Sequence, residues 1–176
     1  MNESCYLLEV DPSTTTQTDE HTSFIGGKPC FPAGTVLPRC RLCETPLTFF
    51  FQVAFPESHF WNRLSLAVFA GVDCAHMDYV IPPMLEGPLR GIDIPQGFLE
   101  DYQVNFRLLV FETAQAHPIQ DYQERIRFAA WRLIPGDAKK ARVNKIGGEP
   151  DWVLEDEAPA AYGGKMAMRF LMQTVE

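Results

Sequence analysis

Apolar residues in this chain occur mainly in short runs or in alternation with polar residues, a pattern typical of β-strands. Alternation is strictest over residues 102–110 and predicts a strand with one buried face. Continuous apolar runs at 5–10, 46–55 and 64–70 predict strands that are buried more deeply. A last run at 166–175 predicts a strand at the end of the chain.

The remaining segments are polar or rich in residues that break regular structure. Residues 126–132 alternate as well, and we expect either a strand beside 102–110 or a helix over 123–133. Residues 13–22 are polar and threonine-rich, which predicts a surface loop. Between residues 81 and 97 the chain has four prolines and three glycines. We expect a long ordered loop there.

One stretch of sequence occurs twice. Residues 25–52 and 146–173 align without a gap when the first is shifted by 121 positions, and seven of the aligned residues are identical. The shared features are a Gly-Gly pair before proline (Gly26-Gly27 and Gly147-Gly148), then further loop residues, then an apolar run interrupted by glutamine (Gln52 and Gln173). Such internal similarity predicts a structural motif that is used twice.

The repeated residues predict their own roles. A Gly-Gly pair allows positive φ and hence a sharp turn. A glutamine inside a buried strand needs hydrogen-bond partners, so we expect Gln52 and Gln173 each to tie down a Gly-Gly turn. The alternative is a paired polar site across a pseudo-twofold axis.

These patterns together predict a β-rich α+β fold. We expect mainly antiparallel sheets with long Pro/Gly-rich loops, and two similar halves related by a pseudo-twofold axis. The whole chain, 1–176, is expected to form a single compact domain, because 176 residues suffice for one core. The boundary between the halves is expected within 81–97.

The charge of the chain restricts its partners. Lys and Arg number 15, Asp and Glu number 23, and the net charge is −8. Duplex nucleic acid and anionic membranes need a positive surface and are therefore not expected as partners. The acidity favours a basic protein partner, or it serves solubility alone.

Cysteine usage and the start of the chain predict a cytoplasmic protein. The five cysteines are an odd number, which fits a reducing compartment better than a disulfide framework. We recognise no signal peptide in the first residues and no apolar stretch long enough to span a membrane.

Four residues form a candidate metal site. Cys40 and Cys43 precede the apolar run 46–55, and Cys74 and His76 follow the run 64–70. If these two runs pair as antiparallel strands, all four side chains come together, and thiolates with imidazole suit zinc. Cys30 is an alternative fourth ligand. Plain reduced cysteines or a redox pair are the other interpretations, and a metal-dependent enzyme would need an open position on such a zinc.

Two further clusters are weaker candidates. Glu57-Ser58-His59 places a nucleophile beside a base, but without a recognised nucleophile motif we interpret it as a solvated turn. The acidic run Glu155-Asp156-Glu157 is a candidate paired-carboxylate site, but we interpret it as a solvated loop that could face a basic partner. No residue is predicted to be catalytic.

The repeats resemble a known family. Lys145–Trp152 and Met168–Gln173 resemble the second half of YwqG-like bacterial proteins, whose function is unassigned. The first half is similar to the programmed cell death protein 2 family in Gly26-Gly27-Lys28-Pro29, Cys40-x-x-Cys43, 46–53 and 60–69. The segment from about 73 to 143 matches neither pattern.

The resemblance implies a duplicated β-rich fold without known catalytic activity. Some YwqG-like proteins are immunity proteins that neutralise a toxin, and the eukaryotic relatives are chaperones for a basic ribosomal protein. In those relatives the Cys-x-x-Cys resembles a metal-binding knuckle.

Together, these observations predict a non-enzymatic, intracellular protein that binds another protein, preferably as an immunity protein, with a ribosomal-protein chaperone as the alternative. The expected contacts are acidic: Glu155, Asp156, Glu157, Glu86 and Asp93. Relatives usually continue with another strand where this sequence stops, so we expect either a truncated version or a final strand without its neighbour, whose unpaired edge would invite strand addition.

Overall fold

The computed structural model describes residues 5–73, 90–152 and 156–175, and these form a mostly β structure. Within these ranges the regular helical structure is limited to the five-residue α1 (Phe98–Tyr102) and a 3-10 turn (Thr113–Gln115). Neither of these has the length and apolar character needed to cross a bilayer. The prediction of a β-rich chain with antiparallel sheets is confirmed.

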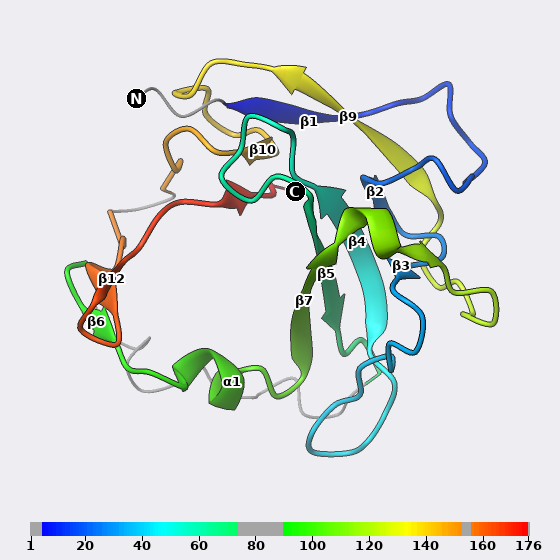
Figure 1. Ribbon diagram of the computed structural model, residues 1–176, viewed down its shortest axis with the longest axis horizontal. Helices are drawn as coiled ribbons and strands as arrows, with labels where there is room; N and C mark the ends of the chain where they lie inside the picture. Colours follow the sequence, from blue (N-terminus) through cyan, green and yellow to red (C-terminus); the bar gives the residue numbers. More distant parts are fainter. Residues whose placement is uncertain (1–4, 74–89, 153–155, 176) are drawn as a thin grey trace.

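The main feature is an eight-stranded sheet that curls into a half-barrel (Figure 1). Each neighbouring pair of its strands is antiparallel. In spatial order the strands are β13 (Met172–Gln173), β10 (Lys145–Ile146), β1 (Tyr6–Val10), β9 (Ala129–Pro135), β2 (Phe24–Ile25), β4 (Thr48–Ala54), β5 (Leu64–Ala70) and β7 (Phe106–Glu112).

Two smaller sheets flank the half-barrel. One consists of β6 (Asp93–Ile94), β11 (Ala161–Tyr162) and β12 (Met166–Ala167), with β6 and β11 parallel. The other pairs β3 (Cys30–Phe31) with β8 (His117–Pro118). In Figure 1 the sheet that contains β6 and β12 lies on the left, apart from β7, and the chain after β12 returns from it to β13.

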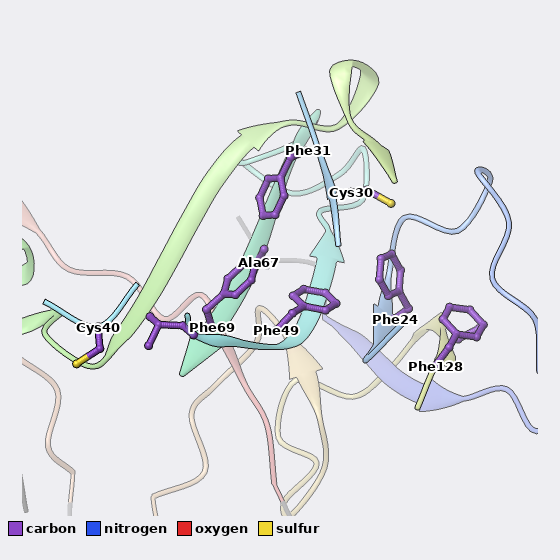
Figure 2. Packing of buried hydrophobic residues seen from close by; sticks show 10 residues of the cluster. Phe24, Cys30, Phe31, Cys40, Phe49, Ala67, Phe69 and Phe128 are labelled. Atoms are coloured by element: carbon purple, nitrogen blue, oxygen red, sulfur yellow. The ribbon is translucent and has the colours of Figure 1, made fainter. Parts of the chain in front are cut away.

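An aromatic core covers one face of the sheet. It joins side chains from β2, β3, β4 and β5 and from the residue just before β9 (Phe24, Phe31, Phe49, Phe69 and Phe128), as Figure 2 shows. Their rings pack 5.3–5.9 Å apart, in tilted, edge-on and stacked arrangements that favour close aromatic contact.

A second cluster, the concave core, fills the inside of the curl. It joins Leu8 of β1 to Leu66 of β5, although three strands separate β1 from β5 in the sheet. Trp131 of β9 and Val53 of β4 belong to the same cluster, so it runs along this face of the sheet from β1 to β5. Leu171 and Met172 near β13 and Val68 of β5 pack against its edge and are only partly buried.

The two repeat segments make the same hydrogen bonds at positions 121 apart. Gly26 N donates to Phe50 O, and Gly147 N donates to Leu171 O, at 2.8 and 2.9 Å. All four repeat glycines have positive φ, between 56° and 78°, as the Gly-Gly turns require.

The two glutamines also bond alike. Gln52 Oε1 accepts from Cys30 N, and its Nε2 donates to Thr22 O. Gln173 Oε1 accepts from Asp151 N, and its Nε2 donates to Val143 O. Each side chain therefore spans the segment that contains its own Gly-Gly turn.

The strands that flank the repeats match as well. Phe24 pairs with Gln52, and Lys145 pairs with Gln173. Ala54 N donates to Ser23 Oγ, and Val175 N donates to Asn144 Oδ1. β10 and β2 each pair with a further strand on their other side: β10 pairs with β1, and β2 pairs with β9. β1 and β9 pair with each other in the centre of the sheet.

Three predicted elements differ from the structure. Residues 129–135 form β9, but β9 does not lie beside 102–110. Its two edges are occupied by β1 and β2, with which it pairs antiparallel. The predicted strand 102–110 is β7, which begins only at Phe106 because Phe98–Tyr102 turns as a helix. The expected strand over 166–175 is reduced to the two short strands β12 and β13.

Candidate partner-binding surface

The structure places two of the predicted acidic segments side by side. Gly91 N donates to Ala158 O at 3.1 Å, and Ala160 N donates to Ile92 O at 2.9 Å. The strands continue this pairing, with Asp93 opposite Ala161. Asp93 therefore lies in the segment that runs alongside the one that follows Asp156 and Glu157, about 60 residues later in the chain.

Asp93, Asp156 and Glu157 are all exposed, and we call them the acidic surface. Asp93 Oδ1 also accepts a hydrogen bond from Gly164 N, and Asp156 Oδ1 accepts one from Ala158 N. These bonds hold the two loops in shape. The ion pairs within the described ranges, Arg125–Asp73 and Arg132–Asp11, involve none of the three, so their charges are available to a cationic partner.

Two predicted contact residues, Glu86 and Glu155, lie outside the described residues, and so does most of the segment 81–97 that was expected to separate the halves. The acidic surface is therefore defined by three of the five predicted residues. Neighbouring apolar side chains on β12 and just after it, Met166 and Met168, are 57% and 40% exposed.

Half of the predicted zinc site is described. The strands β4 and β5 pair antiparallel, with Thr48 opposite Ala70, as the prediction required. Cys74 and His76 lie outside the described residues, so the four-residue site stays a prediction. Within the described ranges no group of three or more His, Cys, Asp or Glu side chains is arranged to hold a metal.

Cys40 and Cys43 sit on a tight turn before β4. Cys40 N donates to Thr45 O and Glu44 N donates to Cys40 O, while Glu44 has a φ of 58°. The Cys40 side chain is buried and the Cys43 side chain is exposed. Cys30 lies at the opposite end of the aromatic core from Cys40 (Figure 2), so it is not in position to complete the site.

The cysteines are expected to differ in reactivity. Burial raises the pKa of Cys30 to about 11 and also raises the pKa of Cys5, whereas Cys43 is exposed. Because the thiolate is the reactive form, iodoacetamide at pH 8 should alkylate Cys43 well before Cys5 or Cys30. Peptide mass spectrometry over a time course measures the order.

The same measurement tests zinc. One equivalent of zinc added to the reduced protein should slow alkylation of Cys43 at least ten-fold if the predicted site forms, because a coordinated thiolate is a poor nucleophile. Unchanged labelling of Cys43 with zinc present would argue for plain reduced cysteines instead.

A cleft of about 1410 Å³ lies between the β4–β5 turn, the end of β9 and the second Gly-Gly turn. Its lining includes Tyr6, Ser58, His59, Asp137 and Arg169. Sequence patterns did not single out Tyr6 or Arg169, because these residues come from segments that meet only in the folded chain.

The predicted solvated turn is confirmed for Glu57 and Ser58, which are exposed, but His59 is buried. Its ring stacks on Phe55 with centroids 4.8 Å apart, and its Nδ1 accepts a hydrogen bond from Trp61 N. Ser58 Oγ instead bonds Tyr6 OH at 2.8 Å. The turn is therefore ordered by these contacts, and the hydrogen bond to Tyr6 connects it to β1.

Comparison with known proteins gives no match: no family model, no curated protein and no solved structure is similar to this chain at a significant level.

Proposed function

We propose that this protein acts by binding a basic protein through the acidic surface, most specifically as an immunity-type protein that occludes a toxin. The observation that carries the proposal is the pairing of β6 with β11, which holds Asp93 beside the segment that follows Asp156 and Glu157. Acidic segments that are distant in sequence and adjacent in space are suited to a partner of opposite charge.

The excess of acidic residues over the whole chain supports the same function. A net charge of −8 gives a long-range field that attracts a cationic protein and speeds its association. The resemblance to YwqG-like proteins adds the immunity role, and the matched hydrogen bonds of the two repeats support the duplicated motif which that resemblance implies. A chaperone for a basic ribosomal protein would use the same charge and is the alternative.

Charge reversal tests the acidic surface. In Glu157→Lys the exposed carboxylate, which makes no ion pair within the described ranges, is replaced by a cation. We expect the Kd for the captured partner to rise about ten-fold in low salt, because like charges then oppose one another. Isothermal titration at two salt concentrations measures this, and the effect should shrink in high salt.

The matched control is Glu20→Lys, which makes the same change of charge in the exposed loop 11–22 on the other side of the molecule (Figure 1). A partner is first obtained by capture on the wild-type protein from native cell extract and is identified by mass spectrometry. If the captured partner is a toxin whose activity this protein inhibits, the protein is an immunity protein. If the captured partner is a ribosomal protein, it is a chaperone. Equal weakening by both variants would show that only net charge matters and that the acidic surface is not the contact.

A further inference from the structure

The C-terminal segment 169–175 presents a strand edge. β13 pairs with β10 on one side, and no strand of the described residues pairs with its other side. Leu171 O and Val175 N make their hydrogen bonds toward β10 and the segment before it. Because the backbone groups of a strand alternate in direction, the N–H and C=O of Met172 and Thr174 point away from β10.

The molecule itself shows what such an edge accepts. In the first repeat, β4 corresponds to 169–175 at the same spacing of 121 residues, and both make matching hydrogen bonds to the strand on their inner side. The outer side of β4 carries β5, which pairs antiparallel with it, with one irregularity between Phe49 and Phe51. The edge of 169–175 therefore has the backbone arrangement on which β5 sits in the other repeat.

At its other end, the same face of the sheet carries exposed apolar side chains. Leu108 and Val110 of β7 pair with Val68 and Leu66, so they lie on the concave face, and they are 42% and 47% exposed. β7 and β13 are the two end strands of the curled sheet, and Leu171 and Met172 near β13 pack on the same face as Leu66.

We propose that an extended segment of the basic partner adds to β13 as an antiparallel strand, in the position that β5 occupies on β4. Its alternate side chains are apolar and face the concave core, and its Lys or Arg residues lie toward the acidic surface, from which the chain returns directly to β13 (Figure 1). This inference rests on the proposed function for the identity of the partner.

The net charge of the chain, and the hydrogen bonding at the other edge of the sheet, favour such a partner over a second copy of this chain. Two copies would each carry −8 and repel one another, whereas a basic segment is attracted. The other end of the sheet is also protected against strand pairing, since Leu108 N already donates to Gln103 Oε1 at 2.7 Å.

The test removes one outward N–H. Thr174 is exposed, and its amide faces away from β10, so Thr174→Pro deletes a donor that no described residue accepts from, and proline is tolerated at such edges. Thr174→Ala keeps the donor and is the matched control. The probe is a synthetic peptide with the sequence of Leu64–Ala70 flanked by two lysines at each end, and fluorescence anisotropy gives its Kd.

We expect Thr174→Pro to weaken binding of the peptide and of the captured partner at least ten-fold, and Thr174→Ala to change either by less than two-fold. Amide exchange measured by NMR on the wild-type protein provides a second readout, because the Met172 and Thr174 amides should become protected when the peptide binds. That measurement decides the question if Thr174→Pro does not fold.

The outcomes separate this inference from the proposed function. If the partner binds Thr174→Pro as well as wild type, strand addition is wrong while partner binding stands. If no basic partner is captured but the peptide binding depends on the Thr174 amide, the edge accepts a strand and the proposed function fails. A dimer of the wild-type protein that dissociates in Thr174→Pro would assign the edge to a second copy and overturn the proposal.

Discussion

Replacing Gly26 with alanine is expected to lower the free energy of unfolding by about 4 kcal/mol, since strain and overpacking combine at this position. Gly26 has a φ of +56°, which side chains with a Cβ rarely adopt. A Cβ there would lie 2.4 Å from the carbonyl oxygen of Ile126 and 2.5 Å from that of Arg127. Both are backbone atoms and cannot rotate away, so the chain before β9 must shift.

Urea unfolding followed by circular dichroism measures this loss. Gly34→Ala is the matched control, because Gly34 also has a positive φ, +81°, but has open space around the position of a Cβ. It should cost only about 1 kcal/mol, the conformational part of the penalty. Equal losses in the two variants would show that the turn at Gly26 does not depend on its close packing.

The substitution Gln52→Leu is expected to cost about 3 kcal/mol, since it leaves two backbone groups without their hydrogen-bond partner. Gln52 is 1% exposed, and its amide satisfies Cys30 N and Thr22 O, so water cannot easily replace it. Leucine fills similar space, and the loss therefore reports on the hydrogen bonds more than on packing.

The equivalent change Gln173→Leu provides the comparison. Gln173 makes the same two kinds of hydrogen bond but is only half-buried, so water can take over part of its role. We expect a loss of about 1 kcal/mol, the net value of exposed or partly exposed hydrogen bonds. A larger loss for Gln173 than for Gln52 would contradict the explanation by burial.

Candidate ligands and partner contacts were less predictable than strands. The acidic run 155–157 and Asp93 were identified by composition, but only the β6–β11 pairing explains why Asp93 lies beside the other segment. Nothing in the local sequence around Tyr6 or Arg169 indicates a cleft, because its walls come from five separate parts of the chain. Contacts between residues far apart in the sequence leave no periodic pattern of apolar and polar residues from which they could be predicted.

The position of β9 illustrates the same limit. Alternation at 126–132 predicted a strand as one option, and the structure has one, but its neighbours are β1 and β2. Period-two patterns state which side chains share a face, whereas partner choice depends on register and turns along the whole sheet. The burial of His59 was missed for a related reason, since Phe55 and Phe60 pack against its ring in a turn that is polar in sequence.

By itself, the sequence determined the β-rich class, the deeply buried strands at 48–54 and 64–70, and the sharp turns at both Gly-Gly pairs, because strand alternation and positive φ are local properties of residues. Tertiary structure decided the order of the strands, the cluster that joins Leu8 to Leu66, and the side-by-side placement of the acidic segments. These depend on contacts between residues far apart in the chain, which are selected only when the whole sheet closes around its core.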